Sequence, residues 1–178
     1  MAACAAAPQS FETEQEPADS RNDCVLWEDL NLDEIESFTL PLMNAQALAE
    51  QDQDPPKDAP LRFAESVEVE ISPHENGTWS SPDGVRQIWR LRIVSPGALS
   101  VNLGFTDYRM PAGGCLYIYP PDRQIVLGPY TEQDNEEHGQ LWTPVIEGEE
   151  LIIEVTLHTE AIPQLRLIIG YINSGYKQ

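Results

Sequence analysis

The stretch Val85–Val94, VRQIWRLRIV, alternates apolar and basic side chains along most of its length. The odd-numbered positions include four apolar residues, Val85, Trp89, Leu91 and Ile93. The even-numbered positions include three arginines, Arg86, Arg90 and Arg92. Because successive side chains of a strand point to opposite faces, this period of two predicts a β-strand with one buried face. We therefore expect Trp89 in a protein core and the arginines on the other side of the sheet.

Seven further runs around this stretch have the composition of strands. They are short, and turn residues such as SPDG, PAGG and PPD separate them. Eight short strands with one apolar face each are typical of an antiparallel β-sandwich, so we predict an all-β, jelly-roll-like domain over residues 61–172. The seven runs are 63–71, 98–105, 115–119, 124–128, 140–146, 150–157 and 165–172.

The densest part of this pattern is FTDYRMPAGGCLYIYPP, residues Phe105–Pro121. Met110–Gly114 separates two strand-like runs with a proline and two glycines, which favour a turn. We expect the two runs to form a hairpin. Cys115, at the start of the second run, has no base nearby in the sequence, and we interpret it as a small buried residue and not as a nucleophile.

The remainder of the chain divides into three parts. Residues 1–39 predict an acidic, largely disordered arm, in which the first 22 residues lack periodicity. The stretch 23–42, which overlaps the end of the arm, favours either a short helix or an extended strip lying on the domain. Residues 40–60 predict a short helix and a Pro-rich linker, because helix formers follow a proline and DQDPPKDAP then ends the helix. Residues 173–178 predict a C-terminal tail leading toward a further domain.

The charge of the chain is strongly negative, with 30 acidic and 10 basic residues and a net charge of −20. Residues 1–60 hold 14 acidic and 2 basic residues, and residues 61–178 hold 16 and 8. Nucleic acid and anionic membranes both require a cationic surface, so neither is an expected partner. No apolar run approaches the length of a membrane span.

The N-terminal sequence MAACAAAPQS lacks the basic and apolar regions of a signal peptide. If the protein is exported, we expect its signal to have been removed, and anchoring as a lipoprotein at Cys4 does not fit the missing apolar stretch. The three cysteines, Cys4, Cys24 and Cys115, have no metal-like spacing. Either Cys4 and Cys24 form a bridge within the arm, or the three thiols are unrelated.

No catalytic, cofactor or metal site is predicted. The three histidines, His74, His138 and His158, have no second histidine at ligand spacing. The acidic run TEQDNEEHG lacks the alternating carboxylates of a calcium loop, and no serine or cysteine lies in a nucleophile motif. Aromatic side chains on an open β-face could instead stack on sugar rings. The candidates are Trp79, Trp89, Trp142, Tyr117, Tyr119 and Tyr130, of which Trp89 lies on the apolar face of its strand and is expected in the core.

The basic residues suggest two hypotheses. Arg86, Arg90 and Arg92 share one strand face, where they either pair across strands with Glu68 and Glu70 or form a cationic stripe that contacts an acidic partner. The chain has two lysines against eight arginines, and neither lysine interrupts the predicted sandwich. Either the chain simply uses arginine in place of lysine, or the domain exists beside a lysine-specific protease, in which case Lys57 and Lys177 are candidate processing sites.

Several phrases of the sequence together resemble one family, the region N-terminal to the catalytic domain in lysyl-endopeptidase-like, trypsin-fold secreted bacterial serine proteases. The phrases are GTW (Gly77–Trp79), WRLRIVSPGALSVNLGFTDYRMPAGG (Trp89–Gly114), LYIY (Leu116–Tyr119) and LWTPVIEGEELIIE (Leu141–Glu154), with LPLMNAQALAEQD and APLRFA between Leu40 and Ala64. The resemblance covers about Leu40 to Tyr176. A cysteine at position 115 and the acidic arm depart from it.

This resemblance implies a pro-domain that assists folding of the protease and inhibits it until cleavage. The implied partner is the cognate trypsin-like serine protease domain, in cis, and the implied location is secreted, extracellular or periplasmic. No catalytic residue carries over, because none of the matching positions is catalytic in the family. From a different class, the alternative is a stand-alone extracellular β-sandwich module that binds glycan or a cell-surface protein.

Overall fold

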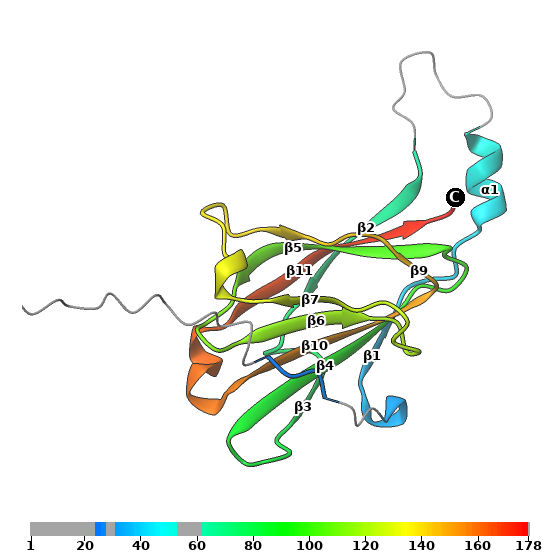
Figure 1. The fold of residues 1–178 in the computed structure, drawn as a ribbon. Helices are drawn as coiled ribbons and strands as arrows, with labels where there is room; N and C mark the ends of the chain where they lie inside the picture. The colour runs from blue at the N-terminus through cyan, green and yellow to red at the C-terminus, as the bar shows by residue number, and fades with distance from the viewer. Residues whose placement is uncertain (1–23, 28–30, 53–61, 178) are drawn as a thin grey trace, which may run out of the picture.

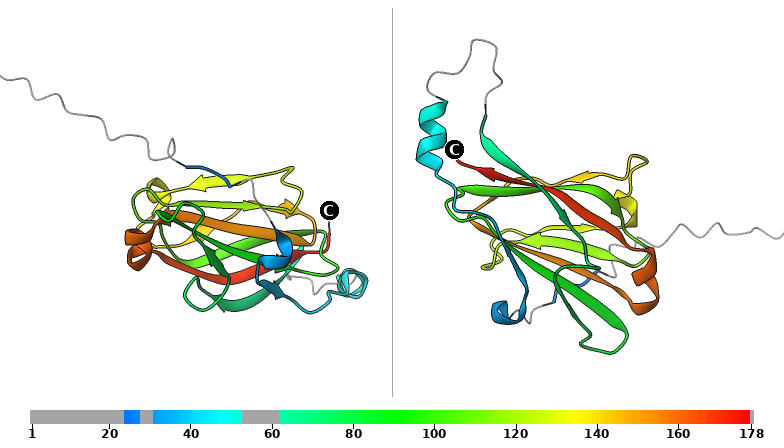
Figure 2. Two further views of the ribbon diagram at one scale, coloured as in Figure 1. Left: turned by 90° about the horizontal axis from the view of Figure 1, so that it is seen from below. Right: turned by 180° about the vertical axis from the view of Figure 1, so that it is seen from behind.

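The computed structural model describes residues 24–27, 31–52 and 62–177. The predicted disordered segment 1–22, Cys4, Lys57 and the Pro-rich part of the linker lie outside these residues. The described chain forms two β-sheets packed face to face, with one α-helix, α1 (Ala45–Gln51), beside the sandwich (Figures 1 and 2). Short 3-10 helices occur at Leu32–Glu34, Glu132–Asp134 and Thr159–Gln164.

The strands follow one another along the chain as β1 (Ser37–Thr39), β2 (Ala64–Ile71), β3 (Thr78–Ser80), β4 (Arg86–Val94), β5 (Ser100–Arg109), β6 (Cys115–Tyr119), β7 (Leu127–Tyr130), β8 (Leu141–Trp142), β9 (Ile146–Glu147), β10 (Glu150–His158) and β11 (Arg166–Gly175). The first sheet has the order β1-β4-β10-β6-β7, with β3 also paired to β4. The second sheet has the order β2-β11-β5-β8, with β9 also paired to β5.

The topology is that of a jelly roll. Along the chain the strands pass repeatedly from one sheet to the other, so that β4-β10-β6-β7 faces β2-β11-β5-β8. All the described strand pairs are antiparallel except that of β1 with β4. The predicted all-β, jelly-roll-like sandwich is confirmed. The sequence did not indicate β1 and β3, and the single run predicted over 140–146 corresponds to two short strands, β8 and β9.

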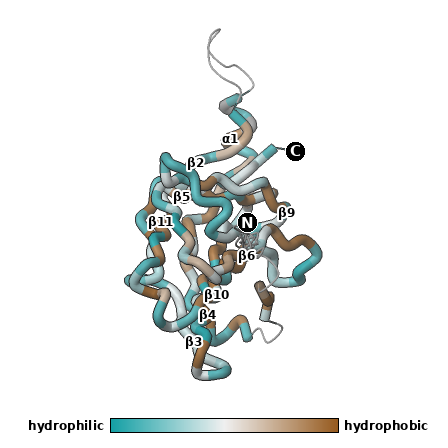
Figure 3. The backbone as a smooth tube through the Cα atoms, turned by 60° about the vertical axis from the view of Figure 1, so that its left-hand side comes forward, coloured by the Kyte–Doolittle hydropathy of each residue, from teal (hydrophilic) through white to brown (hydrophobic). Residues whose placement is uncertain are grey.

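The core lies between the two sheets. Trp89 is fully buried there, as the alternation in β4 predicted, and its indole N–H donates a 2.7 Å hydrogen bond to the Asn76 carbonyl. The tube in Figure 3 shows how hydrophobic and hydrophilic residues alternate along the strands. Burial of one large apolar side chain is worth roughly 1.5–3 kcal/mol, so this shared interior holds the sheets together. Further buried members include Leu91, Ile93, Leu103, Phe105, Ile153, Val155, Ile169 and Ile172.

The expected hairpin at Met110–Gly114 is wrong. β5 pairs with β11, β8 and β9 in the second sheet, whereas β6 pairs with β10 and β7 in the first. The Met110 backbone N–H and carbonyl both bind the Asn135 side chain, each at 2.8 Å, and therefore do not bond to the following strand. The turn thus carries the chain across the core from one sheet to the other.

The helix predicted in 40–60 is confirmed as α1. Its N-cap is Asn44, whose side-chain oxygen accepts a 3.0 Å hydrogen bond from the Ala47 N–H, the usual role of asparagine at this position. Two boundaries differ from the prediction. β1 lies within the predicted arm, and β11 continues through residues assigned to the tail as far as Gly175.

Candidate processing site

Lys177 immediately follows the last strand of the sandwich. The Gly175 carbonyl accepts a 2.8 Å hydrogen bond from the Leu99 N–H, and the Tyr176 N–H donates a 3.1 Å hydrogen bond to the Phe63 carbonyl. The Tyr176 side chain is 4% exposed, so it is part of the core. These contacts fix the backbone immediately before Lys177 and thereby the position from which its side chain extends.

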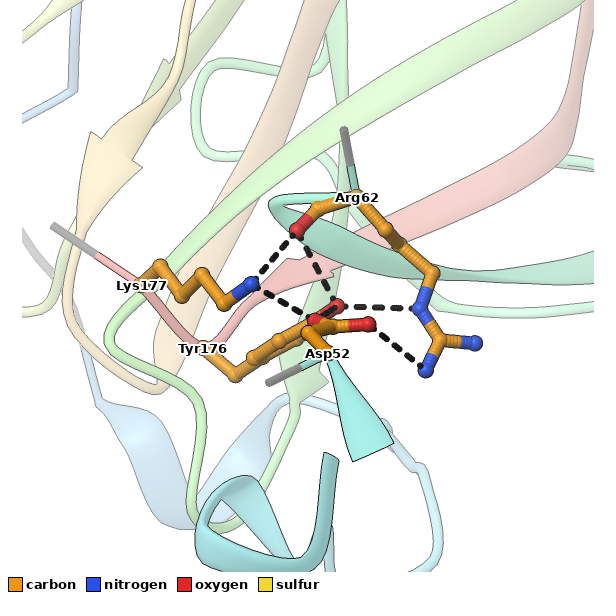
Figure 4. A network of polar contacts seen from close by, with 4 residues as sticks. All are labelled: Asp52, Arg62, Tyr176 and Lys177. Atoms are coloured by element: carbon orange, nitrogen blue, oxygen red, sulfur yellow. Dashed lines mark hydrogen bonds and ion pairs between the residues drawn. The ribbon is translucent and has the colours of Figure 1, made fainter. Parts of the chain in front are cut away.

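The Lys177 ammonium lies in a cluster with Asp52, Arg62 and Tyr176, which we call the lysine cluster (Figure 4). Its Nζ donates to Asp52 Oδ2 at 2.6 Å and to the Arg62 carbonyl oxygen at 3.2 Å. It also lies 5.4 Å from the centre of the Tyr176 ring, within range of a cation–π contact. A carboxylate, a carbonyl and an aromatic ring therefore surround this one ammonium group.

The rest of the lysine cluster orients the Asp52 carboxylate. The Tyr176 hydroxyl donates to Asp52 Oδ2 at 2.6 Å and accepts from Arg62 Nε at 2.9 Å, and Arg62 Nη2 lies 3.5 Å from Asp52 Oδ1. The hydrogen bond from Lys177, and next that from Tyr176, hold the pKa of the Asp52 carboxyl below its ordinary value. The carboxylate is therefore ionised at neutral pH and suited to bind an ammonium group. The cluster contains no serine, cysteine or histidine, so it can bind a lysine but does not hold the nucleophile and base of a serine or cysteine protease.

The sequence identified Lys177 but not its partners. Asp52 is the C-cap of α1, and Arg62 lies just before β2. They are 125 and 115 residues away from Lys177 in the sequence, and only the fold brings them together. The other candidate, Lys57, lies outside the described residues.

The three arginines of β4 do not pair with Glu68 and Glu70, and this expectation is corrected. Both glutamates belong to β2, which is in the second sheet, whereas β4 lies beside β10 in the first. The glutamates that pair with β4 come from β10: Arg90 Nε lies 2.8 Å from Glu154 Oε2, and Arg92 Nη2 lies 2.8 Å from Glu150 Oε1. Arg86 has no ion pair within the part of the chain that the structure describes.

Glu154, on β10 of the first sheet, is a fully buried carboxylate. Besides Arg90, its carboxylate accepts hydrogen bonds from the Tyr119 hydroxyl at 2.7 Å and from the Trp27 backbone N–H at 3.0 Å. Arg123 Nη2 donates to the Trp27 carbonyl at 2.6 Å. The segment 24–27 is therefore tied to the outer face of the first sheet, in agreement with the extended-strip alternative for this part of the arm.

A disulfide joins Cys24 to Cys115. Neither alternative of the sequence analysis, a Cys4–Cys24 bridge or three unrelated thiols, agrees with it. Cys115 is buried, as expected, at the start of β6, and it packs with Tyr117, Tyr119 and Ile152 beneath the segment that carries Cys24. The pairing depends on that segment crossing the sheet, which no spacing between cysteines could reveal.

The aromatic candidates for sugar binding differ in exposure. Tyr117 and Tyr119 are buried beneath the segment 24–27. Trp79, whose indole N–H donates to the Pro73 carbonyl at 2.9 Å, and Tyr130 are half-buried and pack against the core. Trp142 is 53% exposed, and its indole stacks on Tyr171 with ring centres 5.7 Å apart.

The described residues contain no group of three or more histidine, cysteine, aspartate or glutamate side chains placed to hold a metal ion. Among the same residues, no helix has the length and apolar character that a membrane span requires. A disulfide persists in oxidising compartments, so the Cys24–Cys115 bond is consistent with an extracellular location.

The fold and the contents of this site define a β-sandwich domain in which a carboxylate from another element binds the ammonium of the domain's own Lys177. Residues 39–169 match the family described as the lysyl endopeptidase N-terminal domain, and the chain belongs to this family. An N-terminal domain of this kind is a propeptide-like, non-catalytic region of a protease precursor. No solved structure matches the chain.

Proposed function

We propose that this chain is the pro-domain of a secreted or periplasmic trypsin-like serine endopeptidase. It acts in cis, assists folding of the protease, and inhibits the enzyme until it is cleaved. The observation that carries the proposal is the family match, which runs from the end of β1 into β11 and so includes nearly the whole sandwich.

The physical basis for the folding role is the preformed surface of the sandwich. A trypsin-like double barrel contains many contacts between residues distant in sequence, which makes its folding slow. A partner that binds the near-native state and not the unfolded chain stabilises that state by linkage. If the same surface covers the active-site cleft, the pro-domain also inhibits the folded protease.

The distribution of lysines supports residence beside a lysine-specific enzyme. Lys57 lies in the sequence between α1 and β2, and Lys177 lies after β11, so no strand contains a lysine. Arginines, by contrast, occur within the strands, as in β4. We propose that processing occurs after Lys57 and Lys177.

Refolding and inhibition assays test the two roles. The unfolded catalytic domain of a lysyl endopeptidase from the same precursor is diluted into buffer with or without this chain, and recovered activity is measured with a small lysine ester. The mature protease is then titrated with the chain. We expect a higher yield of active protease and a dose-dependent loss of activity, whereas an unrelated β-sandwich domain should do neither. Unchanged yield and activity would refute the proposal.

The hypothesis that the arginine stripe contacts the protease is best tested at Arg86. Arg90 and Arg92 already pair with carboxylates of β10, and replacing them would disturb the sheet. Arg86→Gln is expected to weaken inhibition of the protease, and the matched variant Arg166→Gln, at an exposed pair with Asp107, should leave it unchanged. Equal inhibition by both variants and the wild type would remove Arg86 from the contact surface.

Digestion with a lysine-specific protease tests the processing sites. We expect a stable core near residues 58–177. Because the Cys24–Cys115 disulfide connects the two sides of Lys57, the N-terminal fragment should remain attached until a reductant is added. Degradation of the core, or an intact chain after prolonged digestion, would contradict this expectation.

A glycan-binding module is the second candidate function, and the exposed Trp142–Tyr171 stack favours it. Flat aromatic rings on an open sheet can stack on sugar rings. Binding of the chain to insoluble polysaccharides, lost in Trp142→Ala and retained in Trp79→Phe, would support this function. No binding to a broad set of glycans would exclude it.

A further inference from the structure

A lysine-specific protease must accept the side chain of the residue before the scissile bond into its own pocket. For cleavage between Lys177 and Gln178, that residue is Lys177. In the structure its ammonium is already bound by the Asp52 carboxylate at 2.6 Å and by the Arg62 carbonyl oxygen at 3.2 Å. These are the kinds of ligand that any lysine-binding pocket must provide: a negative charge and additional hydrogen-bond acceptors.

We propose that the lysine cluster is an internal lysine-binding site that competes with the protease for Lys177 and thereby slows cleavage of the Lys177–Gln178 bond. This proposal rests on the proposed function, because it assumes that a lysine-specific protease processes the chain. It adds a specific regulator, Asp52, which belongs to a different element from the scissile bond.

The arrangement of the lysine cluster supports competition and not mere surface pairing. The Asp52 carboxylate comes from the end of α1, the Arg62 carbonyl precedes β2, and Tyr176 and Lys177 follow β11 (Figure 4). The core position of Tyr176 and its hydrogen bonds to both Asp52 and Arg62 hold the acceptors in place. The Lys177 side chain must leave all of these contacts before it can enter a protease pocket.

The same geometry makes the block reversible. The side chain of Lys177 is 31% exposed and that of Asp52 is 18% exposed, so water and salt reach the pair and screen it. The ammonium can therefore leave without unfolding of the sandwich. A protease that binds the end of β11 tightly would overcome the competition, whereas a protease that meets the chain transiently would not.

Substitution of Asp52 tests the proposal. In a chain with Lys57→Arg, Lys177 is the single lysine, and a short Gly-Ser extension after Gln178 places the bond inside the chain. Asp52→Asn is compared with Glu50→Gln, which removes the same charge from α1 at an exposed residue whose side chain bonds to Gln46. Cleavage by a lysine-specific protease, followed by mass spectrometry, should be about tenfold faster in Asp52→Asn and unchanged in Glu50→Gln.

Two controls separate release of Lys177 from general loosening. Cleavage by an arginine-specific protease at Arg90, within β4, should stay equally slow in all three chains, and the rate of acetylation of the Lys177 amine should rise in Asp52→Asn alone. Equal cleavage rates at Lys177 in Asp52→Asn and the parent chain would overturn the proposal, as would a parallel rise at Arg90. Neither result would affect the proposed function, because refolding and inhibition of the protease are measured separately.

Discussion

Replacement of Cys24 by serine is expected to lower the free energy of unfolding of this domain by up to about 4–5 kcal/mol. The bond joins residues 91 apart in the sequence, so in the unfolded chain it closes a loop of nearly that length. In the chain-entropy description, closing such a loop restricts the unfolded state by this amount at 25 °C. Cys24 is the better position to change, because a serine at buried Cys115 would add the cost of an enclosed hydroxyl.

The assay is equilibrium unfolding in guanidinium chloride, followed by tryptophan fluorescence. Trp89 provides the signal, because it is fully buried in the core. Wild type treated with a reductant should unfold at the same denaturant concentration as Cys24→Ser, since both lack the same bond. Cys4→Ser is the matched control and should unfold like the oxidised wild type.

Two results would refute this reasoning. One is a Cys4→Ser variant as unstable as Cys24→Ser, which would indicate a bridge between these two cysteines in place of the observed one. The other is a wild type whose midpoint does not change on reduction. A loss much smaller than 4 kcal/mol, but equal in the variant and the reduced wild type, would mean that the segment 24–27 is released while the sandwich stays folded.

Three further predictions follow from buried and crowded positions. Glu154→Gln should lower the free energy of unfolding by about 3 kcal/mol, because it leaves a buried arginine without its counter-charge, whereas Glu150→Gln, at a half-exposed pair, should cost at most about 1 kcal/mol in the same assay. Burial raises the pKa of four tyrosines, Tyr108, Tyr117, Tyr119 and Tyr130, and nearby Glu154 contributes at Tyr119. Because the pKa of each is higher in the folded than in the unfolded protein, their contribution to stability is complete below about pH 10 and falls as the pH rises above it. The part of the tyrosinate absorbance that belongs to these four tyrosines should therefore rise together with alkaline unfolding and not before it. Gly104→Ala should displace the Trp142 indole, since a Cβ there would lie 2.4 Å from the ring, and the displacement is measurable as a change in tryptophan fluorescence without loss of the fold.

The sequence predicted those features that depend on local periodicity. Alternation in β4 placed Trp89 in the core, turn residues separated the strands, and helix formers after a proline located α1. The eight predicted runs were enough to indicate a jelly-roll-like sandwich. These features can be predicted because a strand or helix repeats its apolar side chains at a fixed spacing, which is visible among neighbouring residues of the sequence.

Part of the candidate site was also accessible from composition. Lys177 was singled out because lysines are rare in this chain and lie outside the strands. The partners of Lys177 could not be predicted, since Asp52 and Arg62 belong to other elements. In so acidic a chain, nothing in the local sequence distinguishes Asp52 from the many other carboxylates.

Only the tertiary structure showed which distant residues and strands pair with one another. It assigned Glu154 to Arg90 in place of the glutamates of β2, joined Cys24 to Cys115, and made Met110–Gly114 a crossing between sheets. In each case the alternative pairings have the same local sequence pattern. They differ only in which distant segment of the chain lies beside the residue or strand in question. That choice depends on how the whole chain buries its apolar faces, and it places Asp52 within hydrogen-bonding distance of Lys177.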